Sequence, residues 1–231
     1  MIPAFLMALE ELGDPRLRRI LVLSMMLAVA VLAALAGLLA FLLHHNDFFA
    51  IWYLDRAVEL LGGLAIAALT WLLFPAVVTL VLGFFLDGAI AVVEARRYPF
   101  LPPARRQSLL DGLRGALRLA LLGIALNLLA LPAYLLLPGL NLVLFYALNG
   151  WLLGREYFEL VALRRLDARA VRAAWRAHRL RLVAGGAAIA FLLTLPLVNL
   201  AAPLLGALFM LHLVERLRQS GADVLVSPGR G

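Results

Sequence analysis

Two long apolar stretches, residues 20–43 and 57–86, dominate the first part of the chain, and no basic residue interrupts either of them. Each exceeds the roughly 20 residues with which an α-helix crosses about 30 Å of hydrocarbon. The pattern predicts two long transmembrane helices, at residues 16–43 and 57–97. Pro75 is expected to kink the second helix, because proline removes one backbone donor and clashes with the preceding turn.

The rest of the chain repeats one pattern twice. Each copy has a basic end, a short apolar arm, a Leu-Pro dipeptide, a turn with Asn and Pro, and a second apolar arm that ends in charged residues. The copies predict helical hairpins at residues 113–163 and 181–218. Arms of residues 119–131 and 182–195 are shorter than a full span, which favours re-entrant hairpins. Ordinary hairpins of full spans, lengthened by neighbouring residues, are the alternative. Broken helices at matching positions in two halves point to a transport site.

Three further segments complete the predicted architecture. Residues 1–14 have apolar side chains on one helical face, which predicts an amphipathic helix in the membrane interface. Residues 164–180 carry arginines at spacings of three and four, which predicts a basic surface helix that suits anionic lipid or an electrostatic funnel for an anion. The polar residues 219–231 are expected to be a disordered tail. The chain is therefore predicted to be an all-α integral membrane protein with a single membrane domain, residues 1–218.

Composition and charge support this architecture and orient it. Hydrophobic residues make up 65% of the 231 residues, more than a soluble core can hide, so lipid is expected to cover the excess. All 21 basic residues are arginine, and the loop between the two long apolar stretches holds one of them, Arg56. Because cytoplasmic loops collect Lys and Arg, the N-terminus is expected in the cytoplasm. The net charge of +7 fits this topology and anionic headgroups, and nucleic acid is not expected as a partner.

No catalytic signature is visible, so an enzyme is not predicted. The chain has no cysteine, which excludes disulfides, iron–sulfur clusters and thiolate sites. His44, His45 and Asp47 are possible metal ligands, but two adjacent histidines at a helix end are far more often a polar cap. Neither a metal nor a cofactor is therefore predicted.

Polar residues inside the predicted hairpins form one group of candidates. Arg155 and Glu159 are four residues apart and can pair on one helix face. Asparagine and histidine at this depth usually form hydrogen bonds between helices, and those near the turns are suited to bind exposed backbone groups. The possible pathway or hairpin residues are Asn127, Asn141, Asn149, Arg155, Glu156, Glu159, Asn199 and His212.

The start of the first long helix is the candidate anion site. Pro15 is favoured at a first helical position, and Arg16, Leu17, Arg18 and Arg19 follow it. The first N–H groups of a helix have no partner in the helix, and the positive end of the helix dipole adds to their attraction for anions. An arginine there can hold an oxyanion with two parallel hydrogen bonds, so the site suits sulfate or phosphate. Positive charge that serves topology alone is the alternative explanation.

Three stretches of the chain resemble the CysZ and etoposide-induced-protein family. The run from Asn149 to Arg165, with Gly-Arg-Glu-Tyr-Phe-Glu just after an apolar arm, resembles its signature stretch. Residues 194–203 and the arm through His212 look similar to its last hairpin, and residues 14–19 resemble its N-terminal pattern. The resemblance implies two long spanning helices and two helical hairpins that only partly enter the bilayer.

For function, the resemblance implies a bacterial inner-membrane permease that supplies sulfate for cysteine synthesis and assembles as a homo-oligomer. The family's sulfate site is a Gly-Leu-Arg element at the start of its first long helix. Arg16, Leu17 and Arg18 occupy the matching positions, with Arg19 next, and Arg16 stands where the family has Gly. Channel-like, facilitated movement of the anion is the predicted mechanism. The alternative is a non-transporting membrane scaffold or bilayer-organising protein of the same fold.

Overall fold

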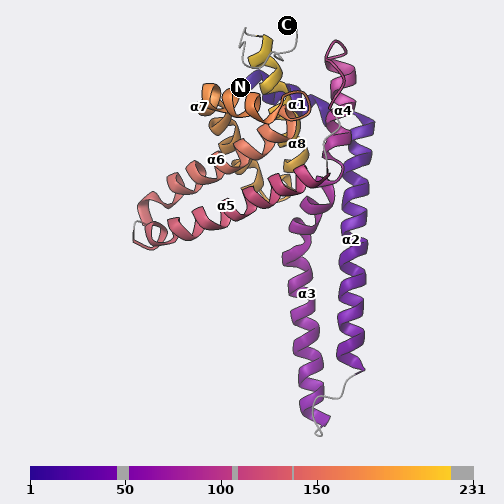
Figure 1. The fold of residues 1–231 in the computed structure, drawn as a ribbon. Coiled ribbons are helices and arrows are strands. Elements are labelled where there is room, and N and C mark those ends of the chain that lie inside the picture. The colour runs from indigo at the N-terminus through magenta and orange to yellow at the C-terminus, as the bar shows by residue number, and fades with distance from the viewer. Residues whose placement is uncertain (46–51, 106–108, 137, 220–231) are drawn as a thin grey trace. The chain divides into compact units, whose positions relative to one another are not determined.

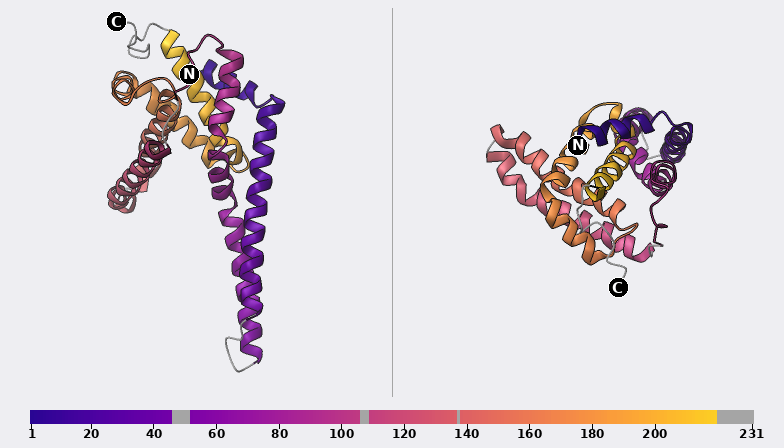
Figure 2. Two further views of the ribbon diagram at one scale, coloured as in Figure 1. Left: turned by 45° about the vertical axis from the view of Figure 1, so that its right-hand side comes forward. Right: turned by 90° about the horizontal axis from the view of Figure 1, so that it is seen from above.

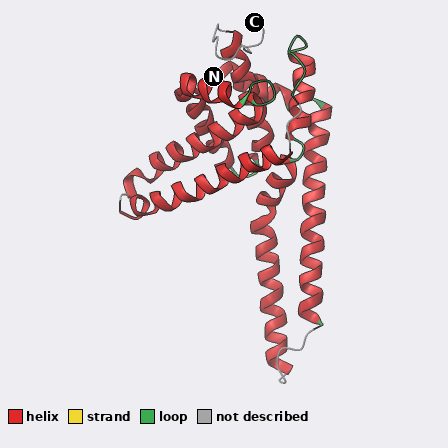
Figure 3. Cartoon of the chain, in the orientation of Figure 1, coloured by secondary structure: helices red, strands yellow, loops and turns green. Residues whose placement is uncertain are grey.

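The computed structural model describes residues 1–45, 52–105, 109–136 and 138–219. Most of the chain in these ranges is helical and they contain no strand (Figures 1 and 3), which confirms the all-α prediction. The predicted tail falls almost entirely outside the described residues. The elements are α1 (Ile2–Glu11), α2 (Pro15–His44), α3 (Trp52–Gly83), α4 (Leu86–Arg97), α5 (Leu109–Leu136), the short 3₁₀ helix η1 (Pro138–Leu140), α6 (Asn141–Ala162), α7 (Ala168–Thr194) and α8 (Val198–Gln219).

The chain divides into two compact units. The two-helix unit is Pro15–Leu86, and the core unit combines Met1–Asp14 with Asp87–Gly231. Among the described helices, α2, α7, α8 and the part of α5 from residue 117 are long and apolar enough to cross a membrane. The two segments of α3 on either side of Pro75 make a fifth span when they are counted together. These helices confirm a multi-pass membrane protein.

The two-helix unit presents apolar side chains outward. On α2, Met26 is 63% exposed, and on α3 Trp71 is 83% exposed. The Thr70 hydroxyl donates to its own helix, at 2.7 Å from the Ile66 carbonyl, so it adds no unsatisfied polar group to this surface. The helix bends by 44° at Pro75, as predicted. Such a surface is suited to lipid rather than water.

The centre of the core unit is α8. About four fifths of its most apolar stretch, 78%, is buried inside the protein, and α1, α6 and α7 pack against it (Figure 2). Ala4 and Ala8 of α1 are fully buried, and Phe5 meets Phe209 of α8 edge to face, with the ring centres 5.8 Å apart. Apolar α1 residues, including Ile2 at 75%, stay exposed, so α1 joins the core on one face only, and its place in the membrane interface stays a prediction.

Two predicted helix boundaries are wrong. The long helix expected at residues 57–97 is two helices, because α3 ends at Gly83 and α4 begins at Leu86. The separate surface helix expected at residues 164–180 is a turn up to Asp167 followed by the first half of α7, which begins at Ala168 and continues to Thr194. His178 has a non-helical backbone (φ −117°, ψ 16°) inside α7. The change from basic to apolar sequence is therefore accommodated by a kink and not by a loop.

The predicted break at Pro132 in the first hairpin is wrong, whereas the predicted break at Pro196 in the second hairpin is confirmed, since α7 ends at Thr194. The helix α5 passes through Pro132 to Leu136, and α8 contains Pro203. One proline removes a single backbone hydrogen bond, and helices in membranes tolerate that loss. The second hairpin does turn between Thr194 and Val198, where Leu197 adopts a positive φ of 65°. The length of the whole helices therefore no longer distinguishes re-entrant from spanning hairpins.

Candidate functional site

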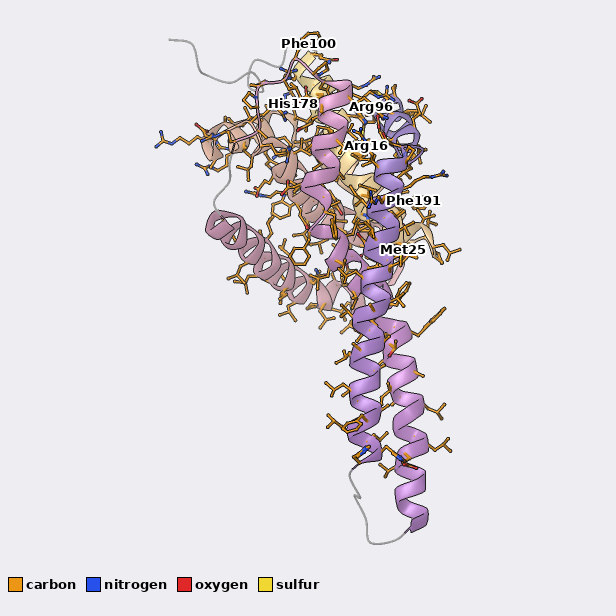
Figure 4. All side chains as sticks on the ribbon, turned by 90° about the vertical axis from the view of Figure 1, so that its right-hand side faces the viewer. Arg16, Met25, Arg96, Phe100, His178 and Phe191 are labelled. Carbon is orange, nitrogen blue, oxygen red and sulfur yellow. The ribbon has the colours of Figure 1, made fainter. Side chains whose placement is uncertain are left out.

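The predicted anion-binding residues lie on the first turn of α2 in the two-helix unit. Pro15 is the first helical residue, and its fixed φ suits that position. The side chains of Arg16, Arg18 and Arg19 are exposed, whereas Leu17 is fully buried, and Arg16 is labelled in Figure 4.

The exposed guanidinium groups have an arrangement suited to an oxyanion. Arg16 and Arg19 are three residues apart and share a helix face. Among the described residues, no carboxylate forms an ion pair with Arg18 or Arg19. Donors at the N-terminal end of the helix dipole attract a negative ion. Arginine adds a planar pair of N–H groups that matches two oxygens of sulfate or phosphate.

In the core unit, an ion-pair group centred on the buried Glu94 ties α4 to the segment after α6; we call it the Glu94 cluster (Asp87, Glu94, Arg164 and Arg165). Nη2 of Arg164 donates to Glu94 Oε2 at 2.9 Å and its Nη1 to Asp87 Oδ1 at 3.1 Å. Arg165 also donates to Glu94. Burial alone would raise the pKa of Glu94, but the hydrogen bonds from Arg165 and Arg164 overcome this effect and lower it. The carboxylate is therefore held in its charged form.

A second ion-pair group joins α1 to the end of α4. The Arg97 guanidinium donates to Glu11 Oε1 at 2.8 Å and to Glu10 Oε2 at 2.9 Å, and these hydrogen bonds raise the pKa of Arg97. Arg96 donates to Asp14 Oδ2 at 2.6 Å and also pairs with Glu11, which is fully buried. These acidic residues therefore hold α1 in place, a role that its amphipathic pattern does not indicate.

The stretch from Asn149 to Arg165 packs α6 against α7. Gly150 and Gly154 bring the two helices so close that a Cβ on Gly186 of α7 would collide with backbone atoms of both. Arg155 pairs with Glu159 at 2.8 Å, as predicted. The guanidinium of Arg155 also lies 5.8 Å and 6.0 Å from the ring centres of Trp151 and Trp175. This stretch therefore serves helix packing, with the Arg155–Glu159 pair at its edge.

The remaining predicted pathway residues are not joined to one another. Asn127 and Asn149 each donate to a carbonyl four residues earlier in the same helix, both at 2.9 Å. Oδ1 of Asn141, at the start of α6, is buried and accepts no hydrogen bond from any described residue. Glu156 is exposed and Asn199 is half-buried in the first turn of α8. Apart from the Arg155–Glu159 pair, no side-chain hydrogen bond within the described part of the chain connects two members of the predicted set.

His212 has a partner that the sequence does not reveal. It is fully buried in α8, and its Nδ1 lies 2.8 Å from the Tyr98 hydroxyl oxygen. The sequence analysis also missed both ion-pair groups, although the opposite charges on α1 and at the end of α4 were a usable signal for the second one. The spacing of Gly150 and Gly154, typical of close helix contacts in membranes, was a usable signal for the contact between α6 and α7.

The described part of the chain does not bring the considered metal ligands together. Asp47 lies outside the described residues, and His44 bonds Glu59 at 2.7 Å.

These features define a multi-pass, all-α membrane protein whose core unit is held by buried ion pairs and close glycine contacts. A protein-family model described as "Sulfate transporter CysZ/Etoposide-induced protein 2.4" matches residues 4–203. The chain belongs to this family. No curated protein and no solved structure matches the chain. Most of α8, including His212, follows the matched residues, so the match does not extend to the arm on which part of the resemblance was based.

Proposed function

We propose that the chain is a permease for a small tetrahedral oxyanion, with sulfate as the first candidate. Its family supports a sulfate-transporter-like protein. The observation that carries the proposal is the position of Arg18 and Arg19, which are exposed on the first turn of a long apolar helix. Their guanidinium groups and the first N–H groups of α2 would capture the oxyanion. No nucleotide or other cofactor is needed for movement down a gradient.

The proposal includes an orientation and partners. The arginine distribution favours an N-terminus in the cytoplasm, and the family resemblance implies the inner membrane of a bacterium. Exposed arginines along the first half of α7 would contact anionic lipid headgroups. A homo-oligomer, as the family resemblance implies, would provide further surfaces for the path of the anion. Sulfate imported in this way would supply cysteine synthesis.

The binding site is tested with Arg18→Ala combined with Arg19→Ala. A hydrogen bond to a charged group contributes about 1.5–3 kcal/mol, so each arginine is worth about tenfold in affinity or more. We expect calorimetry on the purified protein to give sulfate binding about 100-fold weaker or undetectable. Radioactive sulfate uptake into proteoliposomes is expected to fall with it.

The matched control is Arg105→Ala combined with Arg181→Ala. Both side chains are exposed and lie outside the proposed site, so this variant removes the same charge elsewhere. We expect sulfate binding and uptake close to those of the unaltered protein. If Arg18→Ala with Arg19→Ala bound sulfate normally, the site assignment would be wrong.

A second candidate function is a bilayer-organising scaffold. It is favoured by the predicted pathway asparagines, because Asn127 and Asn149 bond their own helices rather than facing one another. The same liposome assay separates the two functions. Sulfate flux above that of empty vesicles supports the permease, and flux equal to that of empty vesicles supports the scaffold.

A further inference from the structure

Apolar side chains of α5 form a row with the spacing of a coiled coil, which we call the α5 seam. Its members follow one another at alternating steps of four and three residues, and each is more than half exposed: Leu117, Leu121, Ile124, Leu128, Leu131 and Leu135. A seven-residue repeat with apolar side chains at two positions is the pattern by which two helices pack along their length. The α5 seam therefore has the form of a helix-packing surface.

The α5 seam is not covered by the described part of the chain. The main neighbours of α5 are α6 and the short η1 (Figure 1). Gly123 faces α6, because a Cβ added to it would lie 3.7 Å from the Leu152 side chain. Leu128 comes five residues later, which is about 140° around a helix of 3.6 residues per turn. The seam therefore points away from α6, and its packing partner lies outside this chain.

Polar groups flank the α5 seam on one side. Asn127 and Tyr134 are seven residues apart, and together with seam residues they line a hollow of about 530 Å³. One amide N–H of Asn127 donates to the Gly123 carbonyl at 2.9 Å. Within the described part of the chain, no hydrogen bond involves the Asn127 carbonyl oxygen or the Tyr134 hydroxyl. Both groups therefore keep hydrogen-bonding capacity for a partner on this face.

These polar groups distinguish a protein partner from lipid. Hydrocarbon offers no hydrogen bonds, so polar groups at membrane depth need partners in protein. Pro132 adds a further acceptor in the seam, because this residue within α5 has no N–H for the Leu128 carbonyl. Acyl chains would cover the leucines but would leave the Asn127, Leu128 and Tyr134 oxygens without partners. A second helix can both pack on the seam and supply the hydrogen bonds.

We propose that α5 is the surface through which two copies of this chain associate in the membrane. A symmetric dimer brings the same patch of both copies together, so each α5 seam meets a seam with the same seven-residue repeat. An amide both donates and accepts hydrogen bonds, so Asn127 can bond the polar groups of an identical helix. The inference rests on the homo-oligomer included in the proposed function, and it names the helix that forms the contact.

Disulfide cross-linking tests this surface, since the chain has no cysteine of its own. Leu128→Cys and Ile124→Cys each place one thiol on the seam. Leu129→Cys is the matched control, because Leu129 is 78% exposed but lies about 100° around the helix from Leu128. With copper phenanthroline in membranes of expressing cells, we expect both seam variants to form covalent dimers. The control should form little dimer, because its thiols are too far apart to bridge.

The polar groups are tested by self-association of the purified protein in detergent. Asn127→Leu combined with Tyr134→Phe removes both side-chain groups beside the seam. We expect the dissociation constant of the dimer, measured by fluorescence transfer between labelled copies on dilution, to rise about three- to tenfold. The control Thr70→Val removes a hydroxyl that already bonds the Ile66 carbonyl of its own helix at 2.7 Å. This control should leave the dissociation constant unchanged.

Several results would overturn the inference. Equal cross-linking of Leu128→Cys and Leu129→Cys would indicate random collision, and cross-linking to another protein would indicate a different partner. An unchanged dissociation constant for Asn127→Leu with Tyr134→Phe would remove the reason for preferring protein to lipid. If neither seam variant cross-linked while the protein still formed oligomers, α5 would be the wrong surface and the proposed homo-oligomer would stand. Uptake is not measured, so failure here is distinct from failure of the proposed transport.

Discussion

At the scale of single residues, Glu94 lies buried between two guanidinium groups. Its pKa is lowered in the folded protein, because hydrogen bonds from Arg165 and Arg164 outweigh the effect of burial. A carboxylate whose folded pKa lies below its unfolded value stabilises the folded state above the unfolded pKa. That contribution is lost as the pH falls through the folded pKa. The thermal stability should therefore be full at neutral pH and decline below the ordinary glutamate value of 4.5.

Replacing Glu94 with glutamine tests this balance. Glu94→Gln leaves Arg164 and Arg165 without their buried counter-charge, and the loss of one partner of a buried pair costs about 3–5 kcal/mol. We expect a clearly lower melting temperature at pH 7 in detergent, measured by scanning fluorimetry. The fall in melting temperature as the pH drops below the ordinary glutamate value of 4.5 should be smaller than in the unaltered protein.

Asp87→Asn is the matched control, because Asp87 pairs with the same Arg164 at 3.1 Å but its side chain is 71% exposed. An exposed ion pair contributes only about 0–1 kcal/mol. If both variants lowered the melting temperature equally, the burial of Glu94 would not be the reason that its ion pairs stabilise the protein.

The sequence could predict contacts within a helix but not those between distant segments. Arg155 and Glu159 pair as expected, since residues four apart meet on any α-helix. Glu94 and Arg164 are separated by 70 positions, and only the packing of α4 against the segment after α6 brings them together. The positions of Arg16 to Arg19 at a helix start were predictable from Pro15. Their capacity to bind an anion is a property of the site that only a binding measurement tests.

At the scale of elements, the α6–α7 contact depends on glycine. A Cβ on Gly186 would collide with the backbone at Gly150 and Gly154, and one on Gly154 would lie 2.5 Å from the Leu182 carbonyl oxygen. Backbone atoms cannot move aside as the end of a flexible side chain can. The two helices must therefore separate before either position accepts a larger residue, and separation would also disturb the packing of Trp151 on Trp175.

Gly186→Ala is therefore expected to be strongly destabilising. Overpacking costs about 1–3 kcal/mol, and a clash with backbone lies at the upper end of that range. In a chain of this size this amounts to a fall of roughly 2–12 °C in melting temperature. Gly37→Ala in α2 is the control, because nothing lies within 4 Å of the added Cβ and alanine favours helix. An unchanged melting temperature for Gly186→Ala would show that the helices adjust freely.

The helices themselves were largely predictable, and their ends were not. Long apolar stretches predicted α2 and α3, because a helix in lipid must satisfy every backbone group internally. Proline predicted the bend at residue 75 but not the continuity of α5 through Pro132 or of α8 through Pro203. A proline costs a helix about 3 kcal/mol, which the packing of a long helix can offset. Whether proline bends or ends a helix therefore depends on contacts that a sequence pattern does not contain.

At the scale of the whole molecule, the charges limit how deep the hairpin tips can reach. Arg155 lies 15 residues from Leu140 and Arg181 lies 14 residues from Leu195, or about 20 Å at 1.5 Å per residue. That is less than the roughly 30 Å of the hydrocarbon layer. As whole helices, α5, α7 and α8 are long enough to span. The short distances from Arg155 and Arg181 to the hairpin tips nevertheless favour re-entrant hairpins.

Cysteine labelling tests the depth, and the chain has no cysteine of its own to interfere. Gly139→Cys and Asn199→Cys, at the two hairpin tips, are expected to resist an impermeant maleimide added to intact cells. His45→Cys, at the end of α2, is the positive control because that end is predicted to be periplasmic, and Ala173→Cys on α7 is the cytoplasmic control. Labelling of both tips in intact cells would show that the hairpins cross the membrane fully and are not re-entrant.

The contact between α1 and α8 has a consequence for how the protein is made. The ribosome synthesises α1 nearly 200 residues before the helix that buries Ala4, Ala8 and the edge of Phe5. Until α8 is synthesised, the apolar face of α1 has no partner in the protein and must be covered by the bilayer surface or by a chaperone. Closure of the core unit is therefore expected late, after α8 emerges, and chains that stop before α8 would expose an unfinished interior to quality-control proteases.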